Sequence, residues 1–252
     1  MSAPLPEKIQ TAVVTGSARG LGADIARALH RAGFRVIITD VDGDAGMALA
    51  SELDLAGETA VTATLDVTRP EDFQAVLDKC VERWGSVEVL VNNAARTAVQ
   101  PVLEIDPAEF NAVMATNAGG TFAGSQIFAR HFKERRFGRI INLASLAGQN
   151  GGTATGAHYA ASKGAILTLT KVFARDLAPY GVTCNAIAPE PMDTPMVRSV
   201  LGDRLEAAVA GIPVGSLGDP IFVAELVALL SGSKAAFVTG ACWDVNGGIY
   251  MR

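Results

Sequence analysis

The sequence predicts an α/β fold in which helices cover both faces of a doubly wound parallel sheet. Short β-prone apolar runs alternate with helical segments along the chain, which is the pattern of right-handed crossovers between parallel strands. Polar or turn-forming residues follow these runs at the edge where such sheets bind ligands: Gly16, Asp40, Asp66, Asn92, Ser145 and Pro189. No linker, repeat or change in composition marks a second domain, so we expect residues 1–252 to form one domain.

Composition excludes several classes of function. The chain has 252 residues, of which 49% are hydrophobic, enough for a continuous core. Its formal net charge of −5 argues against binding to nucleic acid or to an anionic membrane. No apolar run approaches the length of a membrane span, and residues 1–10 lack the apolar core of a signal peptide. We therefore expect a soluble, cytoplasmic protein.

The three cysteines, Cys80, Cys184 and Cys242, are an odd number without CxxC spacing or clustered histidines. This pattern is typical of free thiols in a reducing compartment. We expect the cysteines to be buried, and we expect neither a disulfide framework nor a metal site.

The first unit is a strand at residues 11–15, a glycine-rich turn and a helix that begins near Leu21. Glycines let the backbone approach a diphosphate, and a helix N-terminus supplies free N–H groups. The glycines Gly16, Gly20 and Gly22 have the spacing GxxxGxG, whereas the commonest dinucleotide fingerprint is GxGxxG. The turn by itself is thus consistent either with coenzyme binding or with a tight connection.

The second apolar run, residues 34–39, ends at Asp40. An acidic residue at this place accepts hydrogen bonds from an adenosine ribose and repels the extra phosphate of NADP. The alternative is that Asp40 only opens a loop and caps the next helix. Arg19 in the glycine turn could instead attract that phosphate. We give Asp40 the greater weight, which predicts NAD rather than NADP.

The remaining elements follow from periodicity. Further strands are predicted at residues 59–65, 87–91, 139–144, 182–188 and 242–245, and helices at 70–84, 107–136, 156–178 and 219–231. Gly119 and Gly120 weaken the long helix and predict a kink or a close contact near Asn117. Residues 190–215 are rich in proline, methionine and small residues and are expected to form a substrate loop.

Tyr159 and Lys163 are four residues apart, so on a helix they emerge on one face. A cation beside a phenol lowers its pKa and suits it to exchange a proton with an alcohol or a carbonyl. Ser145 follows a strand and could hold the oxygen that Tyr159 serves. Alone, the pair is also consistent with a chance arrangement on a solvated helix face.

Together, these motifs resemble the short-chain dehydrogenase/reductases over essentially the whole chain. The residues that carry the resemblance are Thr15, Gly16, Gly20, Gly22, Asp66, Asn92, Asn93, Ala94, Asn117, Ser145, Tyr159 and Lys163. The resemblance implies one Rossmann-like domain with about seven parallel strands. It also implies a homotetramer, in which helices 107–136 and 156–178 form one interface and the last strand forms another.

The resemblance assigns the catalytic set Asn117, Ser145, Tyr159 and Lys163. Tyr159 would be the acid/base, Lys163 would lower its pKa and bind the nicotinamide ribose, and Asn117 would hold a water in a proton relay. The implied coenzyme-binding residues are Gly16, Ser17, Arg19, Gly20, Leu21, Gly22, Asp40, Val41, Asp66, Val67, Asn92, Ala94, Tyr159, Lys163, Pro189, Met192 and Thr194. No residue is assigned to a metal.

Within the family, residues 246–251 and 138–141 are most similar to the 3-oxoacyl-carrier-protein reductases. Those enzymes mostly use NADPH, which Asp40 disfavours. They also carry two basic residues near the mouth of the active site for the carrier protein; Arg136 matches one, but Tyr180 stands at the other. Ala95 and Glu190 each replace a usual glycine, and Glu190 either points away or shapes the substrate site.

We therefore expect reversible hydride transfer between NAD(H) and a secondary alcohol or ketone. The alternatives are an NADPH-dependent 3-oxoacyl-carrier-protein reductase and a non-catalytic binding protein with the same fold. We expect residues 96–100, 146–158 and 190–215 to form the substrate pocket. These segments do not identify which alcohol or ketone binds there. Arg96 either binds a substrate carboxylate or is solvated, and His158 either touches substrate or packs. Met192 and Met196 are expected to be apolar lid residues.

Overall fold

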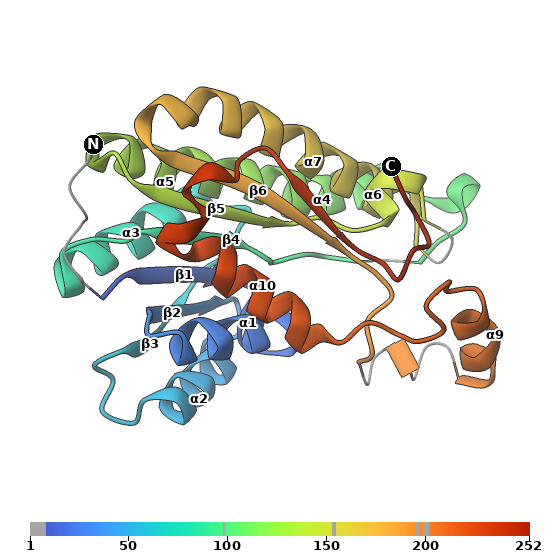
Figure 1. Cartoon of the computed structure of the whole chain (residues 1–252), viewed down its shortest axis with the longest axis horizontal. Helices are drawn as coiled ribbons and strands as arrows, with labels where there is room; N and C mark the ends of the chain where they lie inside the picture. The colour runs from blue at the N-terminus through green and yellow to red at the C-terminus, as the bar shows by residue number, and fades with distance from the viewer. Residues whose placement is uncertain (1–8, 98, 153–154, 195–196, 199–201) are drawn as a thin grey trace.

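The computed structural model describes residues 9–97, 99–152, 155–194, 197–198 and 202–252. One sheet of seven parallel strands runs through it in the order β3-β2-β1-β4-β5-β6-β7 (Figure 1). The strands are β1 (Thr11–Thr15), β2 (Arg35–Asp40), β3 (Ala60–Thr64), β4 (Val89–Asn92), β5 (Gly138–Leu143), β6 (Val182–Pro189) and β7 (Cys242–Val245). The order reverses between β1 and β4, so the predicted doubly wound sheet is confirmed.

Helices cover both faces of the sheet, with α1, α2 and α10 on one face and α3, α5 and α7 on the other (Figure 1). Their bounds are α1 (Gly20–Arg31), α2 (Gly43–Leu53), α3 (Pro70–Trp84), α4 (Pro107–Met114), α5 (Gly120–Arg135), α6 (Ala147–Asn150), α7 (Ala157–Leu177), α9 (Leu205–Ala210) and α10 (Pro220–Ser231). Short 3₁₀ turns are η1 (Val102–Glu104), η3 (Ala178–Tyr180), η4 (Gly202–Arg204) and η5 (Ser233–Phe237).

The core forms because each central strand is buried on both faces. In β1, the side chain of Val14 packs with α1 and α10, whereas that of Val13 packs with α3 and α5. Successive side chains of a strand point to opposite faces, so a continuous apolar run such as residues 11–15 fits only a doubly covered sheet. The sheet thereby holds the carboxyl ends of its strands in a fixed row.

The long helix expected at residues 107–136 is interrupted. α4 and α5 are joined by a π-helical turn, η2 (Ala115–Gly119), which contains Asn117. A Cβ on Gly120 would lie 2.8 Å from the Cβ of Val67, so glycine is needed where the segment packs closely. The expectation of one uninterrupted α-helix was therefore wrong, while the close contact expected near Asn117 from Gly119 and Gly120 is confirmed. Such turns often occur at functional sites.

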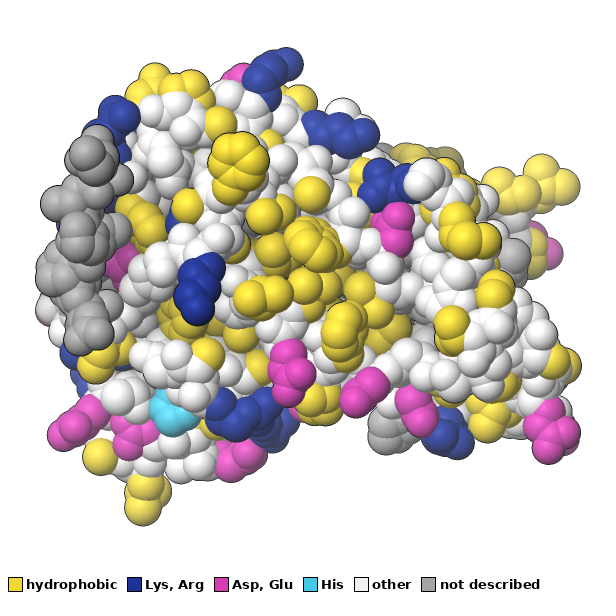
Figure 2. Space-filling view, viewed as in Figure 1, with side chains coloured by type: hydrophobic (Ala, Val, Ile, Leu, Met, Phe, Trp, Pro, Cys, Tyr) yellow, Lys and Arg dark blue, Asp and Glu magenta, His cyan; other side chains and the backbone are white. Residues whose placement is uncertain are grey.

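Apolar side chains remain exposed on the face shown in Figure 2, where they gather near its centre, the region in which Figure 1 places α10. On α10 and the turn after it, the exposed large apolar residues are Ile221, Phe222, Leu229 and Phe237, the last fully exposed. Exposed apolar patches on a protein surface commonly mark contacts with another protein.

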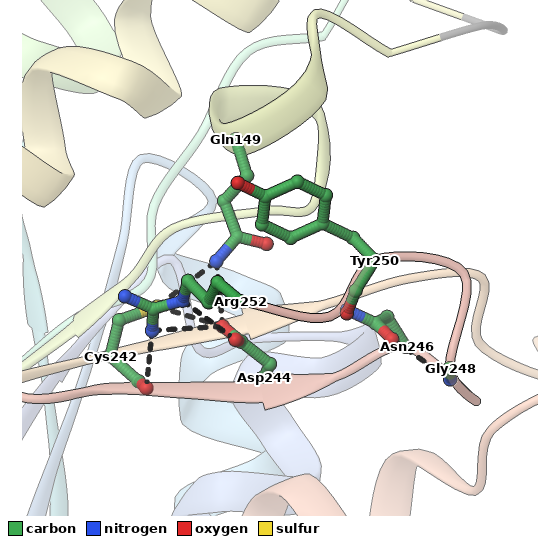
Figure 3. Close-up of polar contacts among 7 residues, drawn as sticks. All are labelled: Gln149, Cys242, Asp244, Asn246, Gly248, Tyr250 and Arg252. Carbon is green, nitrogen blue, oxygen red and sulfur yellow. Dashed lines mark hydrogen bonds and ion pairs between the residues drawn. The ribbon is translucent and has the colours of Figure 1, made fainter.

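The C-terminal tail is fastened to β7 and α6 by polar contacts (Figure 3). Arg252 Nε donates to Asp244 Oδ2 at 2.8 Å, and Gln149 Nε2 of α6 donates to Asp244 Oδ1 at 2.6 Å. Asn246 Nδ2 donates to the Tyr250 carbonyl at 3.1 Å. These contacts hold the end of the chain beside the short helix that follows Ser145.

In the part of the chain that the structure describes, no helix is long and apolar enough to cross a membrane. No three His, Cys, Asp or Glu side chains of the described residues lie together where they could hold a metal ion. Cys80 and Cys184 are buried, as expected, but Cys242 is only half-buried because β7 is the edge strand. All three are free thiols.

Candidate active site

A cavity of about 650 Å³ lies at the carboxyl ends of the strands. The residues that line it are Gly16, Arg19, Leu21, Gly22, Asp40, Val41, Leu65, Asp66, Val67, Asn93, Ala94, Ala95, Arg96, Thr116, Leu143, Ala144, Ser145, Tyr159, Lys163, Pro189, Glu190 and Met192. Segments from nearly the whole chain thus meet around one space, as expected at the reversal of strand order.

The glycine turn forms one wall and leaves no room for side chains. Gly16 has φ +61°, and a Cβ there would lie 2.7 Å from Ala94 Cα. Asn93 locks the turn to the end of β4, because its Nδ2 donates to the Thr15 carbonyl at 3.0 Å and to the Gly16 carbonyl at 2.9 Å. α1 begins directly after, at Gly20. The open backbone at a helix N-terminus fits the diphosphate of a dinucleotide.

Asp40 stands at the end of β2 and lines the cavity. Its Oδ2 accepts from Ala18 N–H at 3.1 Å and its Oδ1 from Asp42 N–H at 3.2 Å, so the carboxylate joins the glycine turn to the loop after β2. The cap of α2 is Asp42, which accepts from Ala45 N–H at 3.1 Å. Asp42 also pairs with exposed Arg19 at 2.6 Å. The alternative in which Asp40 itself caps the next helix is therefore wrong.

Asp66 and Val67 follow β3 on the same side of the cavity. Asp66 Oδ1 accepts from Thr68 N–H at 2.9 Å and from Thr68 Oγ1 at 2.7 Å. Both bonds lower the pKa of the Asp66 carboxyl, and the bond from the Thr68 backbone has the larger effect. Asp66 therefore stays ionised, with a fixed orientation, at the part of the wall that the resemblance assigns to the coenzyme.

The other end of the cavity brings together Ser145, Tyr159, Lys163 and Glu190. Ser145 Oγ donates to Glu190 Oε2 at 2.6 Å and accepts from Ala147 N–H at 3.0 Å. Lys163 is buried, and its Nζ donates to the Leu143 carbonyl at 2.6 Å and lies 5.6 Å from the centroid of the Tyr159 ring. The expected neighbourhood of Tyr159 and Lys163 on α7 is thus present.

The pKa values at this end differ from the expectation. Burial and then the nearby Glu190 raise the pKa of Tyr159 to about 12, although the neighbouring Ser145 hydroxyl opposes this rise. Burial lowers the pKa of Lys163 to about 8 against the opposing effect of Glu190. The predicted lowering of the Tyr159 pKa by Lys163 is therefore not found in this chain alone. Here the loss of solvent and the charge of Glu190 outweigh the opposing effect of Ser145.

Asn117 does not line the cavity. Its Nδ2 donates to Ser162 Oγ and to the Arg96 carbonyl, each at 2.9 Å, and its Oδ1 accepts from Arg96 N–H at 2.7 Å. Ser162 in turn donates to the Tyr159 carbonyl at 2.7 Å. Asn117 therefore joins the π-helical turn and the loop after β4 to the helix that carries Tyr159.

Four predicted coenzyme residues also lie off the cavity wall: Ser17, Gly20, Asn92 and Thr194. Ser17 is buried and donates to the Val14 carbonyl at 2.7 Å, and Thr194 Oγ1 accepts from Val197 N–H at 3.2 Å. Asn92 points into the interior, where its Nδ2 donates to Asn142 Oδ1 at 2.8 Å. Because side chains alternate along a strand, Asn93 rather than Asn92 faces the glycine turn.

Sequence reasoning also missed wall residues. Leu65, Thr116, Leu143 and Ala144 line the cavity without having been assigned to it. Leu143 and Ala144 adjoin Ser145, and Thr116 adjoins Asn117, so proximity in sequence was the available signal. For Asn93 the signal was the position after a strand end, which the family motif had already marked.

The structure bears on three residues whose roles the sequence left open. Arg96 pairs with Glu109 at 2.7 Å on the rim, and its charge is thus already balanced. His158 is buried, accepts from Tyr159 N–H through Nδ1 at 2.9 Å and packs instead of lining the cavity. Ala95, Glu190 and Met192 line the cavity. Met196 lies outside the described residues.

A glycine-walled dinucleotide cleft with tyrosine, lysine and serine at one end defines the class of nicotinamide-dependent oxidoreductases. A family model described as enoyl-(acyl carrier protein) reductase matches residues 16–250. The chain belongs to the short-chain dehydrogenase/reductase family, and the resemblance found in the sequence is confirmed.

Several relatives are similar over nearly their full length. A 3-oxoacyl-[acyl-carrier-protein] reductase FabG of Vibrio cholerae is 37% identical, covering 96% of this chain and 98% of the relative. The protein of the same name from Escherichia coli is 36% identical, covering 95% and 97%. That from Staphylococcus epidermidis is 33% identical, covering 96% and 99%. These names agree better with the carrier-protein alternative than with a generic alcohol dehydrogenase.

Proposed function

We propose that the chain reduces the 3-oxo group of an acyl thioester to a 3-hydroxy group, reversibly. The observation that carries the proposal is the meeting of Ser145, Tyr159 and Lys163 at one end of a dinucleotide-shaped cavity. The names of relatives that align over nearly the whole chain support the thioester. A small secondary alcohol or ketone remains the second candidate, because the wall at this end is small and largely uncharged apart from Glu190 and Lys163.

In this proposal each residue acts at a stated atom. The nicotinamide coenzyme supplies or accepts the hydride. Tyr159 gives its phenolic proton to the substrate oxygen, and its raised pKa keeps that proton available at neutral pH. Ser145 binds the same oxygen. Lys163, held by the Leu143 carbonyl, keeps a positive charge beside the phenol and replaces solvent there.

Asn117 is proposed to act in the proton relay from its position in η2, where its side chain contacts α7. Both atoms of its amide are engaged, and its contact with Ser162 fixes the turn of α7 that carries Tyr159. This arrangement supports a role through α7 more directly than one through a water in the cavity.

We propose NADH as the preferred coenzyme. Asp40 presents a carboxylate at the wall after β2, where the extra phosphate of NADPH would be repelled. Arg19 is the competing feature, because it also lines the cavity and is exposed. Its pairing with Asp42 reduces the charge that it offers to a phosphate. For this reason we give Asp40 the greater weight.

The carrier protein is less well supported than the thioester. Arg136 and Tyr180 precede β5 and β6, so they lie at the amino ends of the strands. The cavity lies at the carboxyl ends, and the expectation that these positions flank its mouth is wrong for a single chain. Lys133 supplies a cation there, 4.4 Å from the centroid of the Tyr180 ring.

The remaining features of the proposal concern organisation. The continuous sheet supports one domain spanning residues 1–252. The segment expected as a substrate loop, residues 190–215, contains η4 and α9 in its described part and is proposed to contact substrate through Glu190 and Met192. Exposed Phe122 and Val172 on α5 and α7, together with the exposed face of α10, support a homotetramer with two kinds of interface. Free thiols support a cytoplasmic location.

The test is an assay of the purified chain with a 3-oxobutanoyl thioester of N-acetylcysteamine and with 2-butanone, each with NADH and with NADPH. Faster reduction of the thioester with NADH is expected. Reduction of the ketone alone would favour the second candidate, and preference for NADPH would show that Arg19 outweighs Asp40. Coenzyme binding without turnover of either compound would contradict the proposal.

A further inference from the structure

Glu190 places a carboxylate at the reactive end of the cavity, where the mechanism above does not use it. It follows β6 directly, and its backbone N–H donates to the Val245 carbonyl of β7 at 3.0 Å. Its Oε2 accepts the 2.6 Å hydrogen bond from Ser145. Among the described residues, none of the ion pairs includes Glu190. The backbone is therefore fixed between two strands, while the charge has no paired cation.

The hydrogen bond to Glu190 uses the single hydroxyl proton of Ser145. A serine hydroxyl donates one hydrogen bond and accepts two. Ser145 gives its proton to Glu190 and uses one acceptor position for Ala147 N–H. In this arrangement Ser145 cannot donate to a substrate carbonyl. If it is to do so, the half-buried Glu190 carboxylate must receive another donor in place of the hydroxyl, because losing a hydrogen bond in a partly enclosed site is unfavourable.

A suitable donor is a group on the substrate itself. Oxygens on neighbouring carbons of a small molecule lie roughly one hydrogen-bond length apart, about 2.5–3.0 Å. The separation of Ser145 Oγ and Glu190 Oε2 is of the same size, 2.6 Å. A substrate with its reacting oxygen at Ser145 would thus bring a donor on the next carbon within reach of Glu190.

We propose that Glu190 determines substrate specificity: its carboxylate binds a hydroxyl or ammonium group on the carbon next to the reacting carbonyl, and this releases the Ser145 proton for the carbonyl oxygen. The same carboxylate rejects substrates with an anionic group at that carbon, because two like charges would meet within hydrogen-bond distance in a partly enclosed cavity. The inference rests on the proposed roles of Ser145 and Tyr159, but not on the thioester.

The test compares two matched pairs of substrates in the full-length protein. One pair is 4-hydroxy-3-oxobutanoyl against 3-oxopentanoyl thioester of N-acetylcysteamine, and the other is hydroxyacetone against 2-butanone. Wild type is expected to prefer the hydroxylated member of each reacting pair by roughly 10-fold or more in kcat/KM, the size of a hydrogen bond to a charged group. In Glu190→Gln and Glu190→Ala the preference should fall several-fold, with turnover of the unsubstituted member retained or raised.

Asp193→Asn is the matched control, since it removes a carboxylate on the same loop that pairs with Arg198. It should leave the preference unchanged. Equal kcat/KM for both members in wild type, or a preference that survives in both Glu190 variants, would overturn the inference. A Glu190-dependent preference between the two ketones, with neither thioester reduced, would support the inference and overturn the thioester proposal instead.

Discussion

The two ends of the cavity hold their carboxylates in different ways. At the end near β2, Asp40 accepts two backbone N–H groups, and Asp42 caps α2 and pairs with Arg19. At the end near β6, Glu190 accepts one side-chain hydroxyl, beside a buried lysine that donates to a backbone carbonyl. At the first end Arg19 and Asp42 form an ion pair. At the second end Glu190 and Lys163 lie in the same cavity without an ion pair between them.

This difference separates binding from chemistry. The carboxylates near β2 have local donors within a few residues or in the adjacent glycine turn, so they are held in fixed orientations suited to recognising a coenzyme. Burial at the other end raises the pKa of Tyr159 and lowers that of Lys163. Groups with perturbed pKa values in a cleft are those expected to move protons.

The largest effect is expected at the phenol. Tyr159→Phe removes the proton donor, so kcat should fall by about 10²–10⁴-fold or more while the Kd of the coenzyme, measured by fluorescence, changes little. Tyr180→Phe is the matched control on the surface and should retain activity. Normal turnover in Tyr159→Phe would remove the distinction between a binding end and a reacting end.

A smaller effect is expected at the end near β2. Asp40→Asn keeps one of the two acceptor oxygens that the backbone N–H groups of Ala18 and Asp42 use, and it removes the charge that repels a phosphate. The ratio of kcat/KM for NADPH to that for NADH should rise roughly 10–100-fold, which is about 1.4–2.8 kcal/mol. Asp44→Asn, in the first turn of α2, should leave the ratio near wild type. An unchanged ratio in Asp40→Asn would show that Asp40 does not select the coenzyme.

The buried lysine predicts a pH dependence of stability. Because the pKa of Lys163 is about 8 in the folded chain against 10.5 ordinarily, the unfolded chain binds more protons between these values. The free energy of unfolding should therefore rise with pH across this window, by at most about 1.4 kcal/mol per pH unit. In urea titrations at several pH values, the free energy of unfolding of Lys163→Met should not show this rise with pH. The exposed control Lys171→Met should show it as wild type does. Parallel curves for Lys163→Met and wild type would contradict the lowered pKa.

The smallest effect is expected outside both ends, at the tail. Arg252→Ala removes a partly exposed pair with Asp244, so the free energy of unfolding should fall by less than about 1 kcal/mol. Arg175→Ala, which removes a more exposed pair, should change it less. A large rise in KM in Arg252→Ala would show that the tail positions α6 and is part of the reacting end.

The sequence by itself determined the sheet, the edge at which ligands bind and most of the cavity wall. Apolar runs that fit only a doubly covered sheet, and polar residues after each run, act over short distances that periodicity reports. The glycine turn, Asp40 and the spacing of Tyr159 and Lys163 are local patterns of this kind. The irregularity at Gly119 and Gly120 was likewise predictable, because glycine weakens a helix and two adjacent glycines there indicated a close contact.

Tertiary structure alone decided what these residues do to one another. The side chain of Asn92 points into the interior, whereas that of Asn93 contacts the glycine turn. Arg19 pairs with Asp42, and Ser145 donates to Glu190, which lies 45 residues further along the chain. The pKa of Tyr159 depends on burial and on the carboxylate of Glu190, which follows another strand. The spacing of residues along α7 predicts neither of these. Desolvation and Coulomb interactions depend on distance in space, and only the folded chain sets those distances.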